Sequence, residues 1–205
     1  MPNSNDSKTE LLRLLRRRSV AFGNFTLSSG ATSSYYVDCK LTTLSPEGAL
    51  LVGQIFYQMI REEAVSLGVH IDAVGGLTMG ADPIALAVGM FSIKHDPSDY
   101  FEVFSVRKSA KEHGRHKLVE GNFNKGDRVV VIDDVVTRGE STLQAINAVE
   151  QEGGSVEFVV VLVDRQEGGR EKIEQRGYKV VSLFNKFDLL PDDVAATKSE
   201  DRAFA

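Results

Sequence analysis

The feature that most constrains the fold is a run of four branched aliphatic residues followed at once by two carboxylates. Residues 129–132 read Val-Val-Val-Ile, and Asp133 and Asp134 come next. A continuous aliphatic run of this length predicts a strand that is buried on both faces, as in a parallel sheet covered by helices. Because two acidic side chains suit a ligand better than a core, we expect them at the carboxyl end of this strand.

An anion-binding turn is predicted to follow the strand. Residues 135–141 read Val-Val-Thr-Arg-Gly-Glu-Ser, and apolar residues then repeat at helical spacing at Leu143, Ile146 and Val149. A turn that enters a helix offers free backbone N–H groups and the positive end of the helix dipole. Two other interpretations fit the acidic pair alone. It could belong to a phosphoacceptor domain, whose pair would lie near the N-terminus without such a turn, or to a buried strand that ends in two acids by chance.

Composition limits the class of protein. The 205 residues suit a single domain with its own core, and 24 Lys and Arg against 29 Asp and Glu leave a formal charge of -5. This charge favours neither a nucleic-acid nor a membrane partner. The single cysteine, Cys39, excludes an intrachain disulfide and fits a reducing compartment. No run approaches the ~18 apolar residues of a spanning helix, and the polar start lacks a signal-peptide core, so we expect a cytoplasmic protein.

Helix and strand patterns alternate along the rest of the chain. Ser7 and Glu10 have capping-box spacing at the start of one helix, and Ser45-Pro46 begins another that ends near Gly68. An apolar helix is predicted through residue 90, and further strands are predicted at about 71–76, 100–106, 156–163 and 178–184. This alternation predicts one α/β domain whose ligands bind beyond the carboxyl ends of parallel strands. We expect residues 1–6 and the tail from about 192 to 205 to be loosely held.

A separate small hood is predicted at about residues 20–40. Aromatic and β-branched residues lie on both sides of a Ser- and Gly-rich turn, which predicts two strands that stand apart from the main sheet. Tyr35 and Tyr36 on the second of these strands either pack across the strand pair or stack on a flat aromatic ligand.

A second candidate phosphate site follows the strand at 71–76. Thr78, Met79 and Gly80 connect that strand to the apolar helix, and a glycine-rich loop in this position can present backbone N–H groups to an anion. The alternative is that Gly75, Gly76 and Gly80 only permit tight packing.

A basic loop is predicted at about residues 107–118. Five cations and two histidines lie between Arg107 and Lys117, although the whole chain is acidic. The loop is either a solvated hairpin end or a mobile lid that neutralises phosphate charge and excludes water when it closes.

The central motif of four aliphatics, two acids, two aliphatics and Thr-x-Gly-x-Ser resembles the phosphoribosyl-pyrophosphate (PRPP) signature of the type I phosphoribosyltransferases. The resemblance implies an α/β fold with helices on both sides of a central, mostly parallel sheet. It also implies that the acids hold the ribose hydroxyls, that the turn cradles the 5-phosphate, and that residues 78–80 bind pyrophosphate. The PRPP-binding residues implied by this motif are Asp133, Asp134, Val135, Val136, Thr137, Arg138, Gly139, Glu140 and Ser141.

Two further segments are similar to one branch of this superfamily, the orotate phosphoribosyltransferases. They are the hood, with Phe-Thr-Leu-Ser-Ser-Gly before the tyrosine pair, and Arg-Lys-x-x-Lys-x-His-Gly in the basic loop. The similarity of the basic loop adds to the implied PRPP-binding residues Arg107, Lys108, Lys111 and His113. The resemblance implies that Tyr35, Tyr36, Thr137 and Arg165 bind orotate. A guanidinium suits the orotate carboxylate, although Arg165 could instead pair with a neighbouring acid. Ser28 stands where many bacterial members carry lysine, and Met79 lies in a loop where several relatives carry one. Arg138 stands where relatives usually carry a small residue.

The same resemblance implies a mechanism and an assembly. Asp133 and Asp134 would stabilise a cationic ribose, and Lys111 or His113 would donate a proton to the leaving pyrophosphate. The basic loop would reach into the site of a neighbouring subunit, which implies a homodimer with shared sites. Magnesium would be held mainly by PRPP, in agreement with the lack of a metal-ligand cluster in the sequence. The expected reaction is orotate plus PRPP to orotidine 5′-monophosphate and pyrophosphate; the alternatives are a purine phosphoribosyltransferase and a non-catalytic PRPP sensor.

Overall fold

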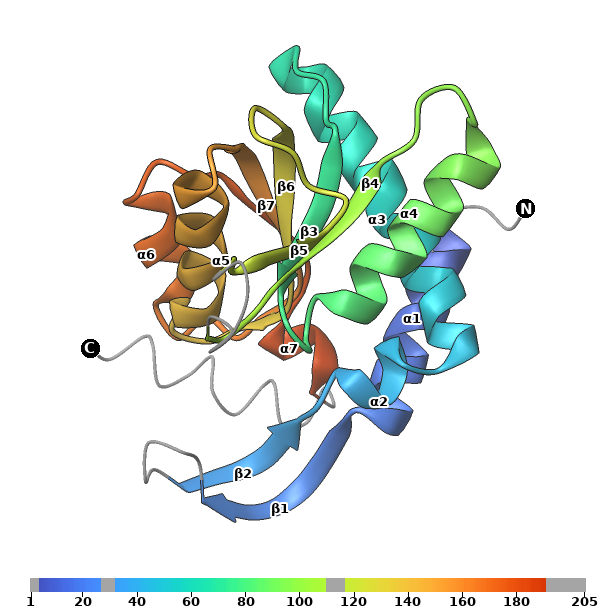
Figure 1. The fold of residues 1–205 in the computed structure, drawn as a ribbon. Coiled ribbons are helices and arrows are strands. Elements are labelled where there is room, and N and C mark those ends of the chain that lie inside the picture. The colour runs from blue at the N-terminus through green and yellow to red at the C-terminus, as the bar shows by residue number, and fades with distance from the viewer. Residues whose placement is uncertain (1–3, 27–31, 110–116, 191–205) are drawn as a thin grey trace.

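A parallel sheet forms the centre of the molecule. The computed structural model describes residues 4–26, 32–109 and 117–190, and these residues form a six-stranded sheet in the order β5-β4-β3-β6-β7-β8 (Figure 1). The strands are β3 (Ala73–Leu77), β4 (Glu102–Val106), β5 (Val119–Gly121), β6 (Arg128–Val136), β7 (Ser155–Asp164) and β8 (Val180–Asn185). All neighbouring pairs are parallel except β4 and β5. The predicted α/β architecture is confirmed.

Helices cover both faces of this sheet, and β6 shows why. Val130 and Ile132 contribute to the core beneath α1 (Ser4–Arg18), α3 (Pro46–Leu67) and α4 (Asp82–His95). Val129 and Val131 contribute to the core beneath α5 (Glu140–Gln151) and α6 (Gly169–Glu174). Since side chains alternate between the faces of a strand, a continuous aliphatic run is needed where both faces are covered.

The helix predicted from Ser45 is confirmed at both ends. The Ser45 hydroxyl accepts a hydrogen bond from the backbone N–H of Gly48, and Pro46 occupies the first turn. Gly68 ends the helix in the left-handed conformation at φ 67°, which a residue without a side chain adopts at little cost. Two short helices, α2 (Lys40–Thr43) and α7 (Lys186–Leu189), complete the helices of the described residues.

Some predicted boundaries differ from the structure. The first helix already includes Ser4 rather than beginning at Ser7, and Ser7 is buried within it, so the expected fraying is wrong for residues 4–6. Asp6 in the first turn complements the helix dipole and makes this longer helix favourable. The helix predicted through residue 90 extends to His95, because Ser92 and neighbouring residues continue to pack against the core.

The hood consists of β1 (Val20–Thr26) and β2 (Thr32–Val37), which pair only with each other. The two strands project from one end of the domain, as Figure 1 shows. Phe22 lies opposite Tyr35, and an irregularity in the pairing follows before Phe25. The prediction of two strands apart from the main sheet is therefore confirmed. Within the described residues no helix is both long and apolar enough to cross a membrane.

Candidate active site

The carboxyl ends of three adjacent strands meet at one edge of the sheet. β3 ends before the loop that contains Thr78, β6 ends after the acidic pair, and β7 ends directly before Arg165. In parallel sheets of this kind ligands bind beyond these ends. The fold thus brings together the main sequence-predicted segments, which are far apart in the chain.

The acidic pair lies in the last part of β6, and both side chains are buried. Asp133 is 5% and Asp134 9% exposed. One oxygen of Asp133 accepts a hydrogen bond from the Thr142 hydroxyl at 2.7 Å, and the other accepts one from the N–H of Asp134 at 3.0 Å. Asp134 in turn accepts a bond from the N–H of Val135 at 3.0 Å. Thr142, in the first turn of α5, is a site residue to which sequence reasoning assigned no role.

Burial changes the ionisation of this pair. Removal from water, followed by the charge of Asp134, raises the pKa of Asp133 to about 7. Burial also raises the pKa of Asp134, but the nearby Lys40 ammonium group opposes this rise. Lys40 begins α2 directly after the hood and contacts Asp38 at 2.8 Å. Its position beside Asp134 was missed, because no local pattern relates residues so distant in the chain.

The predicted phosphate turn adopts the conformation expected of a helix entry. Gly139 precedes α5 with φ 78°, and a Cβ there would lie 2.9 Å from the carbonyl oxygen of Gly169. Only glycine fits both constraints. The N–H groups of the first turn of α5 have no acceptor within the helix, so they remain available to an anion. The side chain of Val136 is buried in the core, and that of Val135 is half-buried, so these residues can offer a ligand mainly their backbone.

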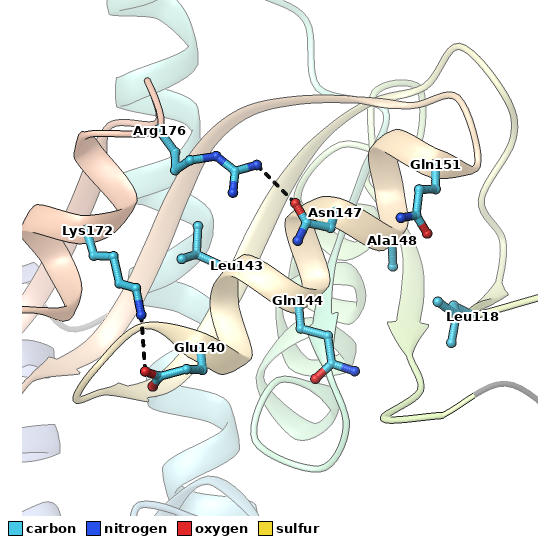
Figure 2. Close-up of a pocket in the computed structure, with 9 residues that line it drawn as sticks. All are labelled: Leu118, Glu140, Leu143, Gln144, Asn147, Ala148, Gln151, Lys172 and Arg176. Atoms are coloured by element: carbon cyan, nitrogen blue, oxygen red, sulfur yellow. Dashed lines mark hydrogen bonds and ion pairs between the residues drawn. The ribbon is translucent and has the colours of Figure 1, made fainter.

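The side chain of Glu140 points away from this turn. It forms an ion pair with Lys172 of α6 at 3.2 Å, at one end of a groove of about 420 Å³ along α5 (Figure 2). The hydrogen bond from Lys172 lowers the pKa of Glu140. Arg138 and Ser141 are exposed. Glu140 can therefore contribute its backbone N–H to a phosphate while its charge is neutralised by α6.

The glycines of β3 and the glycine of the predicted pyrophosphate loop, residues 78–80, have different roles. A Cβ on Gly75 would lie 2.2 Å from a backbone oxygen of β4, and a Cβ on Gly76 would lie 2.1 Å from a backbone oxygen of β6. These two glycines therefore permit the strands to pack. A Cβ on Gly80 would lie 2.4 Å from a carboxylate oxygen of Asp134. Gly80 therefore brings the loop backbone against the acidic pair. The Thr78–Met79 peptide is cis, and the Met79 side chain is exposed.

Arg165 is buried beneath the hood. Its guanidinium carbon lies 4.9 Å from the centre of the Tyr35 ring, and one terminal nitrogen pairs with Glu167 at 2.9 Å. Within the part of the chain that the structure describes, the buried Nε of Arg165 has no hydrogen-bond partner. The expected alternative, pairing with a neighbouring acid, is thus present, yet one donor of the guanidinium is left for a ligand.

The two hood tyrosines point in different directions. Tyr35 is buried over Arg165, whereas Tyr36 is exposed and packs against Phe25, with 5.6 Å between ring centres. Adjacent residues of a strand face opposite sides, so the described chain places only Tyr35 beside Arg165.

The basic segment is described only at its two ends. Arg107 lies 3.7 Å from Glu120, and the carbonyl of Lys108 accepts a hydrogen bond from Gln144 of α5 at 2.9 Å. Lys111 and His113 lie outside the described residues, as do Ser28 and the predicted tail from 192 to 205. The roles assigned to Lys111 and His113 stay predictions.

Comparison with known proteins identifies the family. No protein-family model matches the chain. An orotate phosphoribosyltransferase from Aquifex aeolicus is 44% identical over 186 residues, which cover 89% of this chain and 97% of the relative. The Mycobacterium tuberculosis orotate phosphoribosyltransferase solved with Fe(III) dicitrate superposes with a TM-score of 0.75 at 41% identity, covering 89% of this chain and 98% of that one. The same enzyme solved with PRPP gives 0.71 at 37% identity, with 89% and 98% covered.

These similarities extend over nearly the whole length of each relative and confirm the predicted type I phosphoribosyltransferase fold. The buried acidic pair, the glycine turn before α5 and Arg165 beneath the hood lie together within the matched fold. The chain belongs to the orotate phosphoribosyltransferase family.

Proposed function

We propose that the chain converts orotate and PRPP to orotidine 5′-monophosphate and pyrophosphate in pyrimidine biosynthesis. A bond forms between a ring nitrogen of orotate and the anomeric carbon of the ribose. The bond from that carbon to pyrophosphate breaks, and its electron pair leaves with pyrophosphate. The observation that carries the proposal is the meeting of the acidic pair, the Gly80 loop and Arg165 at one edge of the sheet.

The acidic pair acts as a fixed negative field beneath the ribose. The Thr142 hydroxyl and two backbone N–H groups hold the carboxylate oxygens of Asp133 and Asp134, so the pair needs little reorganisation during the reaction. Burial raises the pKa of both carboxyl groups, that of Asp133 to about 7. A positive charge on the ribose favours the ionised form of the pair, so the pair is negative in the state that it stabilises.

Arg165 is proposed to bind the carboxylate of orotate. Its buried, unpaired Nε offers a donor, and the Tyr35 ring beside it is suited to stack on a planar pyrimidine. Tyr36 and Thr137 stay predictions as orotate contacts, as do the PRPP contacts of the basic segment.

Magnesium is proposed as the cofactor. Among the residues that the structure describes, no group of three or more His, Cys, Asp or Glu side chains could hold a metal ion. The acidic pair supplies hard carboxylate oxygens, but octahedral magnesium needs further oxygen ligands, and PRPP carries them. Held in this way, magnesium would neutralise charge on the pyrophosphate leaving group.

A homodimer with shared active sites is also proposed. Leu86, Met90 and Ile93 are spaced along one side of α4, and each is at least 46% exposed. Met79 of the pyrophosphate loop is exposed just before the same helix. An apolar stripe on a monomer favours contact with another chain. A second copy seated there would lie beside the active site, as sharing of the basic loop requires.

One assay tests the proposed reaction. Loss of orotate absorbance is followed with PRPP and magnesium, and adenine, hypoxanthine and uracil serve as control bases. We expect consumption of orotate alone. Consumption of a purine would favour another phosphoribosyltransferase, and binding of PRPP without consumption of any base would favour a sensor. The cytoplasmic location and the lack of nucleic-acid or membrane partners belong to the same proposal, and cell fractionation tests the location.

A further inference from the structure

Asp82, the first residue of α4, joins two segments of the active site. One carboxylate oxygen accepts a hydrogen bond from the Thr78 hydroxyl at 2.6 Å, and the other accepts one from the Ser105 hydroxyl at 2.6 Å. Thr78 opens the pyrophosphate loop, and Ser105 lies near the end of β4, two residues before Arg107. Both distances are typical of strong bonds to an ionised acceptor.

The start of the pyrophosphate loop is held both by its backbone and by the side chain of Thr78. The backbone N–H of Thr78 donates to the carbonyl of Val106 at 2.8 Å, so its main chain is tied to β4 while its side chain is tied to α4. The N–H of Ala81 donates to the carbonyl of Leu77 at 3.2 Å and closes the loop. Met79 and Gly80 therefore span a short segment between fixed ends.

The position of the loop has little tolerance. Gly80 already lies so close to Asp134 that one added methyl group would approach a carboxylate oxygen to 2.4 Å. A loop that binds an anion through backbone N–H groups depends on where those groups point. Contact with the acidic pair limits movement of the loop toward Asp134, and the Asp82 bond restrains the loop at Thr78.

The charge of Asp82 can also stabilise α4 itself. An acidic residue in the first turn stabilises its helix through the dipole. That effect requires the negative charge, but it does not require the hydroxyl groups of Thr78 and Ser105. Asp82 uses both carboxylate oxygens on two different segments, and a dipole effect alone would not require this arrangement.

We propose that Asp82 is a positioning residue for the pyrophosphate group, which it influences through Thr78 and Ser105. The inference rests on the proposed function, because it assigns the loop to pyrophosphate. Asp82→Ala should raise the KM for PRPP and the Kd for pyrophosphate by about 10-fold, with the KM for orotate changed far less, since a small displacement of binding groups is costly. Asp82→Asn, whose amide can still bond both hydroxyls, should restore most of the affinity.

The other end of α4 offers a matched control. Asp96 accepts a hydrogen bond from the Ser98 hydroxyl at 2.6 Å, but it is far along the helix from the pyrophosphate loop. Asp96→Ala should therefore leave the KM for PRPP unchanged. Thr78→Val and Ser105→Ala each remove one of the two bonds and should give smaller increases. In a chain that already carries Asp82→Ala, either change should raise the KM for PRPP little further, because the residues act through one network.

The measurements distinguish failure of this inference from failure of the proposed function. Calorimetric titration of the folded wild-type chain with pyrophosphate and magnesium tests the loop whether or not orotate is turned over. If Asp82→Ala binds pyrophosphate as tightly as wild type and Asp96→Ala, the inference is wrong. It is also wrong if Asp82→Asn and Asp82→Ala lose affinity equally, because the charge would then be the cause. Should Asp82→Ala fail to fold, Thr78→Val and Ser105→Ala decide the question by the same titration.

Discussion

Asp133 accepts a hydrogen bond from the Thr142 hydroxyl and lies beside the carboxylate of Asp134, in a position removed from water. These surroundings set the pKa of Asp133. Burial and Asp134 raise the pKa of Asp133 from 3.8 to about 7. Folding therefore favours the protonated form. The stability contributed by that proton is fully present below pH 3.8 and is lost as the pH rises through about 7.

The first prediction concerns Asp133→Asn, which imitates the protonated side chain. At pH 8 the variant should exceed wild type in free energy of unfolding by roughly 1–4 kcal/mol, because it avoids a buried charge. The difference should shrink toward pH 5, and turnover should be lost. Chemical denaturation at the two pH values measures this. Glu62→Gln, on the exposed side of α3, is the control for loss of a carboxylate without burial. An equal difference at pH 5 and pH 8 would contradict the assigned cause.

The second prediction concerns the shape of the guanidinium of Arg165. Arg165→Lys keeps the charge but loses the planar fork, so the KM for orotate should rise about 10-fold or more, while the KM for PRPP changes little. Steady-state kinetics with each substrate varied in turn provides the measurement. Arg170→Lys, at a partly exposed pair with Glu174, is the matched control. A similar effect of both variants would remove Arg165 from orotate recognition.

The pyrophosphate loop approaches β6 closely only because residue 80 is a glycine. Gly80→Ala places a methyl group 2.4 Å from a carboxylate oxygen of Asp134, so the loop or the carboxylate must shift. We expect kcat/KM for PRPP to fall about 100-fold, the scale of loss that a displacement of about 1 Å can cause, in a chain that still folds. Circular dichroism checks the fold, and kinetics with PRPP varied checks the loss. Unchanged kinetics would show that PRPP binding does not depend on the close approach of Gly80 to Asp134.

The apolar stripe on α4, formed by Leu86, Met90 and Ile93, predicts association of two chains. Met90→Lys places a charge in this stripe and should shift the chain from dimer to monomer in sedimentation at micromolar concentration. Gln151→Lys on α5, which packs on the other face of the sheet, is the control and should leave the assembly unchanged. A wild-type monomer, or a dimer unaffected by Met90→Lys, would exclude this surface.

Sharing of sites between subunits makes a further prediction. Asp133→Asn and Lys111→Ala should each be inactive alone, but a mixture should regain activity, since a mixed dimer contains one site with an intact acidic pair and an intact basic loop. Turnover is measured after subunit exchange has been demonstrated with differently tagged chains. Exchange without recovery would argue that each chain uses its own loop.

Much of the site was predictable because its signals are local. The aliphatic run predicts β6, the glycine turn predicts the entry to α5, and the carboxylates between them indicate the ligand site. The helix from Pro46 to Leu67 was likewise predictable. Its serine cap and proline act on the first turn, and its closing glycine acts on the last turn, so each signal is local. The start of the first helix was missed, because capping-box spacing at Ser7 is compatible with a helix that extends further.

The strand, turn and helix around Asp133 and Asp134 follow from the amino-acid sequence, because periodicity and glycine conformation depend on neighbouring residues. The groups from distant parts of the chain that surround this pair are seen in the folded molecule alone. The fold places Lys40 beside Asp134, Thr142 on Asp133, Tyr35 rather than Tyr36 over Arg165, and Asp82 between Thr78 and Ser105. The physical reason is that the packing of helices and strands sets these distances, and the order of residues along the chain carries no direct signal of them.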